Sequence, residues 1–179
     1  AAGLQPASRH AGCDGMSTAQ LTEHRERNRH LLAQARSVME FVYEQIRHCG
    51  SMVILADRQG TVLHSLGDAE FVDRASRVAL APGASWREER RGTNAIGTAL
   101  VEARPVEIFG AEHFLDRNTF LTCSASPLFD PRGEVVGVLD ISGDHRAYQS
   151  HTLGLVGMAA QMVEKRLFEN LPGEALRVA

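Results

Sequence analysis

Two β-prone stretches, residues 121–129 and 134–142, flank the tetrapeptide DPRG at positions 130–133. Asp at the first position, Pro at the second and Gly at the fourth form the pattern of a type I turn. Strands joined by so short a connection pair antiparallel, because a parallel pair needs a long crossover. This hairpin excludes an all-parallel sheet and places an antiparallel sheet at the centre of the expected structure.

Helices and a second hairpin surround this pair of strands. Apolar residues at steps of three and four predict the helices, and short apolar runs bounded by turn residues predict the strands. The expected elements are a helix over 18–48, strands over 52–56 and 61–65, a helix after Asp68, a helix over 93–103 with Thr93 as N-cap, a strand over 106–109, the hairpin above and a helix over 149–169. Their order predicts an α+β domain: one antiparallel sheet, with the two long terminal helices on one face and shorter helices and loops on the other.

The chain has 179 residues, which suffices for one domain with a complete core but not for two. Residues 1–17 mix Gly, Ala, Pro and Ser without periodicity and are expected to form a flexible leader. We expect the folded domain over 18–171 and the start of a linker over 172–179.

Charge and hydropathy exclude several classes of protein. There are 19 Lys and Arg against 22 Asp and Glu, a net charge of −3, which gives no basic face for nucleic acid. No apolar run approaches the roughly 18–20 residues that span a bilayer. Cys13, Cys49 and Cys123 are widely spaced, as expected for reduced thiols. We expect a cytoplasmic domain without a membrane segment or direct contact to nucleic acid.

Alternation along the two best strands divides their side chains between two faces. The first set, expected beneath the terminal helices, is Leu121, Cys123, Ala125, Leu139 and Ile141; the second is Thr122, Ser124, Ser126, Val138, Asp140 and Ser142. The second set is either a solvated sheet face or the floor of a polar pocket. The pocket gains support because the segment 86–120 must pack somewhere and carries Trp86, Phe109, Phe114 and Phe120.

Three polar residues are candidates for ligand contact, each with a structural alternative. His113 is either a loop residue or a hydrogen-bond donor to a ligand. Asp140 is a buried carboxylate that needs partners, or it lies at the sheet edge or pairs with Arg90 or Arg91. Asn94, near a helix N-terminus, holds a ligand oxygen or acts as a second capping side chain. The full candidate set for ligand binding is Trp86, Asn94, His113, Phe114, Phe120, Thr122, Ser124, Asp140 and Ser142.

The sequence carries no recognisable catalytic or metal-binding constellation. The eight histidines include no HExxH or HxxxH pair, there is no GxSxG, and no GK[ST] follows the glycines at 92 and 97. We expect a protein that is not an enzyme and holds neither a cofactor nor a metal.

Long contiguous motifs over residues 20–171 resemble a known family, the N-terminal sensory GAF domains of bacterial sigma-54-dependent transcriptional activators. Among these, the similarity is greatest to acetoin-catabolism regulators. The motifs are SMVILADRQGTVLHSLGD (51–68), GTNAIGTAL (92–100), PVEIFGAEHF (105–114), LTCSASPLFDPRGEVVGVLDISGD (121–144) and HTLGLVGMAAQMVEKRLFEN (151–170).

The resemblance implies a GAF fold: a central antiparallel sheet of about six strands, terminal helices on one face and a ligand pocket on the other. It also implies a sensory role. A small effector such as acetoin, or a related hydroxyketone or alcohol, would change the packing of the terminal helices and so control a downstream AAA+ ATPase and DNA-binding domain. DNA and the sigma-54 RNA polymerase would be contacted through those other domains, and a homodimer would form through the terminal helices.

Two alternative functions stay open at this point. Some GAF domains are free methionine sulfoxide reductases that use clustered pocket cysteines; here Cys123 is the only candidate, and its expected position is on the helix side. The other alternative is a purely dimerising module. The segment TEHRERNRH at 22–30 is too charged for a dry seam between helices.

Overall fold

The computed structural model describes residues 5–7 and 15–170. Most of the expected leader and all of the expected linker at 172–179 therefore lie outside the described residues. The elements are α1 (Thr18–Arg27), α2 (Arg29–Ile46), β1 (Ser51–Asp57), β2 (Val62–Gly67), α3 (Ala69–Ser76), α4 (Glu88–Arg91), α5 (Ala95–Glu102), β3 (Val106–Phe109), β4 (Leu121–Phe129), β5 (Val135–Asp144) and α6 (Thr152–Glu169), with short 3₁₀ turns at Gly110–Glu112, Asp116–Asn118 and His145–Ala147.

The strands of the described part form one sheet of five strands in the order β2-β1-β5-β4-β3. Every neighbouring pair is antiparallel, as the short turns require. The sheet thus has five strands in this part of the chain where about six were expected. The longest strands, β4 and β5, lie next to each other and carry the hairpin that the DPRG turn predicts.

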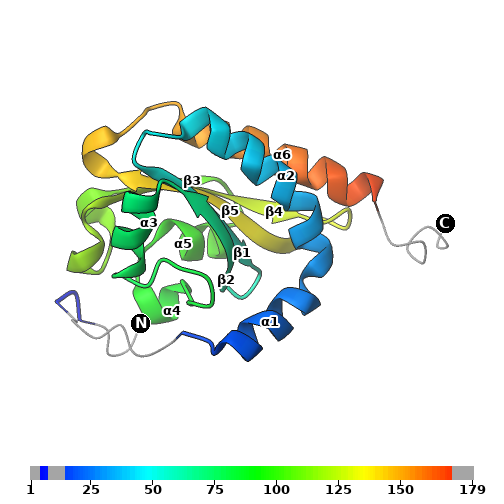
Figure 1. Cartoon of the computed structure of the whole chain (residues 1–179), viewed down its shortest axis with the longest axis horizontal. Coiled ribbons are helices and arrows are strands. Elements are labelled where there is room, and N and C mark those ends of the chain that lie inside the picture. Colours follow the sequence, from blue (N-terminus) through cyan, green and yellow to red (C-terminus); the bar gives the residue numbers. More distant parts are fainter. Residues whose placement is uncertain (1–4, 8–14, 171–179) are drawn as a thin grey trace.

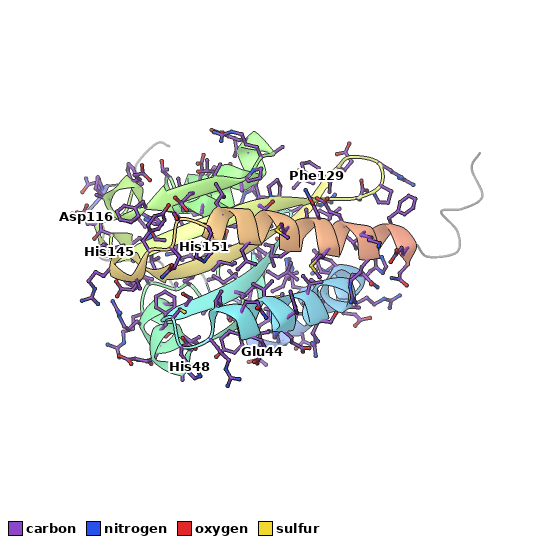
Figure 2. All side chains as sticks on the ribbon, turned by 90° about the horizontal axis from the view of Figure 1, so that it is seen from above. Glu44, His48, Asp116, Phe129, His145 and His151 are labelled. Atoms are coloured by element: carbon purple, nitrogen blue, oxygen red, sulfur yellow. The ribbon has the colours of Figure 1, made fainter. Side chains whose placement is uncertain are left out.

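Helices cover both faces of this sheet (Figure 1). On one face α2 and α6 lie side by side, as Figure 2 also shows from above. Their buried side chains form a core with Val53, Leu55, Leu139 and Ile141 of the central strands. On the opposite face, α3 and α5 enclose a second core with residues such as Ile54 and Trp86. The predicted α+β arrangement is confirmed.

The long helix predicted over 18–48 is interrupted at Asn28, so that prediction was wrong in detail. Asn28 has φ −102° and ψ 18°, and its side-chain Nδ2 donates to the backbone oxygen of His24 at 2.9 Å. The helix after this break has an apolar stripe that faces the sheet, whereas α1 buries no residue. Because the two halves differ in what they can bury, α1 diverges from α2 (Figure 1).

Candidate functional site

The hairpin places different residues on the candidate face than alternation suggested. Cys123 pairs with Ser142, and Ala125 pairs with Asp140. Directly opposed residues share one face of a sheet, so Cys123 lies beside Asp140 and Ser142 rather than beneath the terminal helices. The predicted positions of Leu121, Cys123 and Ala125 were therefore wrong, because these residues belong to the core that contains Trp86.

Thr122 and Ser124 lie on the opposite face, so their predicted place in the floor of the pocket was wrong for the same reason. Ser124 pairs with Ile141, which packs in the core under α2 and α6. The hydroxyl of Ser124 donates to the Glu107 carboxylate at 3.0 Å. Thr122 is also buried, and its hydroxyl has no hydrogen-bond partner among the described residues.

Trp86 packs on the candidate face, in the same core as Cys123 and Ala125. Its ring is 1% exposed, and its indole N–H donates to the backbone oxygen of Ala79 at 2.9 Å. The backbone N–H of Trp86 donates to Gly60 at 2.8 Å. The guanidinium of Arg91 lies 5.3 Å from the centre of the indole ring, within range for a cation–π contact. The indole is therefore held on several sides.

Asn94, rather than Thr93, is the N-cap of α5. Its Oδ1 accepts the backbone N–H of Gly97 at 2.8 Å, and its Nδ2 donates to the backbone oxygen of Gly92 at 2.8 Å. A side chain at position 97 would bring Cβ within 2.8 Å of the Trp86 backbone oxygen. The glycine thus permits close contact between α5 and the Trp86 segment, and Asn94 acts as the capping side chain that was one of its two expected roles.

A small enclosed void separates the sheet from α5 and Trp86, and we call it the chamber. It amounts to about 160 Å³ of space between atoms, with no room for a water-sized molecule. Its lining residues are Leu80, Trp86, Asn94, Ala95, Ile96, Cys123, Asp140 and Ser142. Four members of the predicted set therefore meet here. Leu80, Ala95, Ile96 and Cys123 were missed. The periodicity of α5 placed Ala95 and Ile96 on one helix face but did not show that this face meets Asp140.

The polar groups of the chamber form a buried chain. Ser142 Oγ lies 2.5 Å from Oδ2 of Asp140 and 3.0 Å from Sγ of Cys123. Oδ1 of Asp140, a fully buried residue, has no hydrogen-bond partner among the described residues. Burial raises the pKa of Asp140 to about 7, although the hydrogen bond from Ser142 favours the ionised form. Burial, and then the neighbouring Asp140, raise the pKa of Cys123 well above its usual value.

His113, Phe114 and Phe120 do not line the chamber. His113 is buried, but it is not among the lining residues of the chamber. Its Nδ1 lies 2.9 Å from the backbone oxygen of Gly110. Burial lowers the pKa of the imidazole. Phe114 packs over Gly92, where its ring occupies the space that a Cβ would take. The ring of Phe120 lies 6.5 Å from that of Phe71, below the Arg74 guanidinium.

Within residues 5–7 and 15–170, no group of three or more His, Cys, Asp or Glu side chains is arranged to hold a metal ion. Nor does any helix in that part of the chain have both the length and the apolar character to cross a membrane.

Comparison with known proteins decides the family. The model of the GAF domain matches residues 30–167, most of the chain. The chain belongs to the GAF family. The acetoin catabolism regulatory protein of Cupriavidus necator is 36% identical over 143 residues, or 80% of this chain and 21% of that protein. The acetoin dehydrogenase operon transcriptional activator AcoR of Bacillus subtilis is 33% identical over 148 residues, or 83% of this chain and 24% of AcoR.

A third relative is the signal-transduction and transcriptional-control protein of Clostridium beijerinckii, 33% identical over 79% of this chain and 22% of its own length. This GAF chain thus spans about a fifth to a quarter of these relatives. Among solved structures, the E. coli DhaR(N)–DhaL complex contains a chain that matches with a TM-score of 0.89 at 19% identity, over 97% of this chain and 60% of that one. That likeness supports the GAF fold.

Proposed function

We propose that this GAF domain is the effector-sensing part of a bacterial sigma-54-dependent transcriptional activator, and that its effector is a small uncharged polar metabolite such as acetoin or a related hydroxyketone or alcohol. Two of the relatives are named as acetoin regulators. The observation that carries the proposal is the buried oxygen Oδ1 of Asp140, which lines the chamber without a hydrogen-bond partner among the described residues. A ligand hydroxyl or carbonyl would complete that site.

The chemistry of the chamber selects against charged ligands. Four of its eight lining residues are apolar and none is cationic, so a second carboxylate there would lose its hydration without a cation in the lining to replace it. Asp140, with a pKa of about 7, carries a proton for part of the time near neutral pH and then donates to a ligand carbonyl. In its ionised form it accepts from a ligand hydroxyl. Both forms suit a molecule that contains a hydroxyl next to a carbonyl.

Ligand binding has to enlarge the chamber. This change of structure is the proposed link between effector binding and the regulatory output of the domain. The void of about 160 Å³ holds no water-sized space, so Trp86 or α5 must move to admit a ligand. A ligand shifts such an equilibrium only by its difference in affinity between the two states. For about six heavy atoms, the ceiling of roughly 1.5 kcal/mol per atom is near 9 kcal/mol, so micromolar to millimolar affinity is expected.

The output is expected to pass through α2 and α6. Phe41 of α2 and Met158 and Met162 of α6 are exposed large apolar residues, at 53%, 68% and 42%. We propose that these helices form a homodimer whose packing changes with effector binding and controls a downstream AAA+ ATPase and DNA-binding domain in a cytoplasmic activator. Light scattering of the native chain and of Met158→Glu, Met162→Glu tests the dimer; equal masses at all concentrations would contradict it.

The effector proposal is tested by calorimetry and thermal shift with acetoin, 2,3-butanediol and, as a charged comparison, lactate. Acetoin and the diol should raise Tm by an amount that grows with the logarithm of their concentration above Kd, whereas lactate should not raise it. Asp140→Asn should weaken acetoin binding, and Asp116→Asn, an exposed carboxyl, should leave it unchanged. No heat and no shift with any hydroxyketone or alcohol would remove the proposal.

A reductase role for Cys123 has less support. Its side chain does face the chamber, contrary to the expected helix side, but burial raises its pKa. A reactive thiol needs a lowered pKa. Cys49, the other cysteine of the described residues, is exposed at the end of α2 rather than beside Cys123. We expect no thioredoxin-coupled reduction of free methionine sulfoxide; activity that Cys123→Ser abolishes would overturn this.

A further inference from the structure

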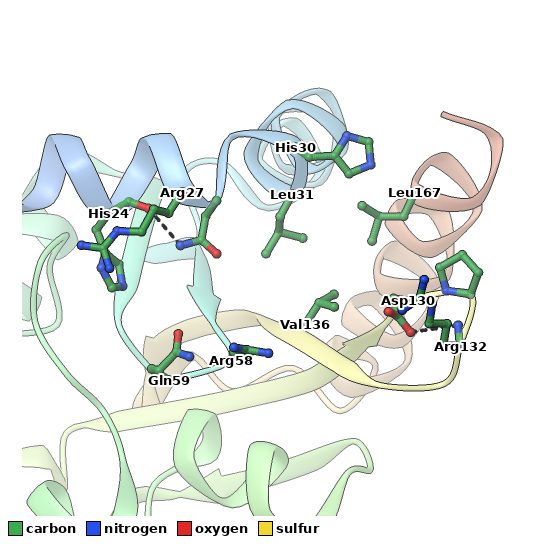
Figure 3. Close-up of a pocket in the computed structure, with 12 residues that line it drawn as sticks. His24, Arg27, His30, Leu31, Arg58, Gln59, Asp130, Arg132, Val136 and Leu167 are labelled. Atoms are coloured by element: carbon green, nitrogen blue, oxygen red, sulfur yellow. Dashed lines mark hydrogen bonds between the residues drawn. The ribbon is translucent and has the colours of Figure 1, made fainter. Parts of the chain in front are cut away.

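A groove of about 840 Å³ opens at the end of the sheet remote from the α2–β1 connection (Figure 3). It lies between the α1–α2 junction, the turn after β1, the DPRG turn and the last turn of α6. Its lining residues are His24, Arg27, Asn28, His30, Leu31, Arg58, Gln59, Asp130, Pro131, Arg132, Val136 and Leu167. None of them lines the chamber on the other side of the sheet. The groove is therefore a separate feature of the domain.

The inner wall of the groove is apolar. Leu31 from α2, Val136 from β5 and Leu167 from α6 surround its middle (Figure 3). Leu31 and Leu167 are each 6% exposed, because they also pack into the core beneath α2 and α6. A molecule in the groove would therefore rest directly on the two helices through which output is expected to pass.

The rim of the groove is cationic. Arg58 follows β1, and Arg132 lies in the DPRG turn; both are exposed, and neither forms an ion pair with a described acidic side chain. Asp130 is the only acidic residue in the lining, and its Oδ1 already accepts the backbone N–H groups of Arg132 and Glu134, each at 2.9 Å. Two guanidinium groups are therefore left to face solvent beside an apolar wall.

The walls are also fixed in place, as a binding site requires. His24 hydrogen bonds to the fully buried Asp57, whose other oxygen accepts the N–H of Gln59 at 2.8 Å and of Thr61 at 2.9 Å. These bonds hold α1 against the turn that carries Arg58. On the far side, Glu164 of α6 accepts the N–H of Phe129 at 3.1 Å and so ties α6 to the end of β4.

We propose that this groove binds a small amphiphilic anion, a molecule with an apolar body of several carbons and one terminal carboxylate. Concave sites of about 300–1,000 Å³ with mostly apolar walls and a few polar groups are typical of small-molecule binding. Guanidinium groups match the geometry of a carboxylate and bind it with charge-assisted hydrogen bonds. The anion is thus a second input to the domain, of opposite chemistry to the uncharged effector of the chamber, and it does not depend on the effector proposal.

A competition experiment with decanoate tests this proposal. The fluorescence of bound 8-anilinonaphthalene-1-sulfonate reports how much of the dye decanoate displaces. On the native chain, decanoate should displace the dye saturably, and decanol, which lacks the charge, should bind at least about tenfold more weakly. Arg58→Gln and Arg132→Gln should each weaken decanoate about fivefold or more. Arg77→Gln, in an exposed ion pair with Asp73, is the matched control and should remain within about twofold of the native chain.

Several outcomes would overturn the proposal. These are equal affinity for decanoate and decanol, native affinity in both groove variants, and no saturable displacement by decanoate at millimolar concentration. Displacement of the dye by a twelve-residue peptide of alternating Glu and Leu, without displacement by decanoate, would also overturn it and assign the groove to a protein partner. Far-ultraviolet circular dichroism and Tm of each variant show that the fold is intact. Retention of acetoin binding in the arginine variants separates this site from the chamber.

Discussion

The hydroxyl of Ser142 lies 2.5 Å from Oδ2 of Asp140, two residues away on the same face of β5. This contact gives Oδ2 of Asp140 a hydrogen-bond donor. The other carboxyl oxygen, Oδ1, has no hydrogen-bond partner in the described part of the chain, and Asp140 lines the chamber. A buried carboxyl in this position is stable mainly in its neutral form. Its protonation therefore couples both the stability of the fold and the chemistry of the chamber to pH.

Asp140→Asn should reveal that coupling. An unfolded aspartate ionises near pH 4, whereas Asp140 keeps its proton up to about pH 7. Between these values the native state binds more protons than the unfolded state, so the contribution of Asp140 to stability falls as pH rises. Asparagine does not titrate. The stability of the variant relative to the native chain should increase from pH 4 to pH 7 by about 3 kcal/mol.

Urea unfolding at a series of pH values measures this difference, because all other groups titrate alike in both proteins. Asp116→Asn, at an exposed carboxyl, is measured in parallel as the control for an aspartate-to-asparagine change. A stability difference that stays constant with pH for Asp140→Asn would contradict the raised pKa of Asp140.

Gly92→Ala should destabilise the fold more than Gly133→Ala, although both glycines have a positive φ. Gly92 has φ +64°, and a Cβ there would lie 2.3 Å from the ring of Phe114. Gly133 has φ +81°, but nothing lies within 4 Å of a Cβ added there. Alanine strains the positive-φ backbone at both positions, and the strain is severe at Gly92, whose φ of +64° and ψ of −160° lie in a region that essentially only glycine adopts. Only the Gly92 change also displaces a packed ring, at a further cost of about 1–3 kcal/mol. Unfolding midpoints in urea compare the two; equal losses would show that Phe114 moves freely.

Asp68 should matter for the junction between α2 and β1 rather than as a helix cap. Its carboxylate accepts the hydroxyl of Tyr43 at 3.0 Å and the N–H groups of His48 at 3.1 Å and Gly50 at 2.9 Å, and it makes no capping bond to α3. Tyr43→Phe removes one charge-assisted hydrogen bond to the carboxylate, and it should destabilise the fold less than Asp68→Ala, which removes the acceptor of all three bonds. Chemical unfolding at pH 7 gives both values.

The pH dependence of Asp68 has the opposite sign to that of Asp140. Burial alone would raise the pKa of Asp68, but the hydrogen bonds from His48 and Gly50 outweigh it and lower the pKa. The stabilisation from Asp68 is thus present above the ordinary aspartate pKa and lost as pH falls through the lower native value. Asp68→Ala should therefore approach the native chain in stability at acid pH. A loss that persists unchanged to pH 2 would contradict this.

Turn motifs and the spacing of apolar residues predicted most of the fold. The DPRG turn placed the hairpin, and strands 106–109 and 121–129 begin and end where expected. The break at Asn28 was not predictable from apolar spacing. The residues before it are mostly polar and carry no apolar pattern whose interruption would mark the end of a helix. Which residue caps α5 was equally open, since Thr93 and Asn94 both accept hydrogen bonds readily.

The composition of the chamber depends on register, which alternation alone does not determine. At the turn, Phe129 pairs with Val135, and an irregularity between Leu128 and Phe129 shifts the register by one residue. Beyond it, Cys123 opposes Ser142. A shift of one residue transfers a whole set of side chains to the other face. Asp140 and Ser142 therefore line the chamber, whereas Thr122 and Ser124 were assigned to the wrong side of the sheet. The ligand-binding role of Trp86, Asn94, Asp140 and Ser142 stays a prediction.

Cys123 provides a direct measure of whether the chamber opens. Its side chain is 4% exposed with a raised pKa, whereas Cys49 is exposed. Iodoacetamide should therefore alkylate Cys49 at least about a hundredfold faster than Cys123, as followed by mass spectrometry of the separate peptides. Because Cys123 reacts only when the chamber opens, bound acetoin should change its rate and leave that of Cys49, the internal control, unaltered. Equal rates at the two thiols would mean that the chamber is open to solvent. An unchanged Cys123 rate at saturating acetoin would place the effector site elsewhere in the domain.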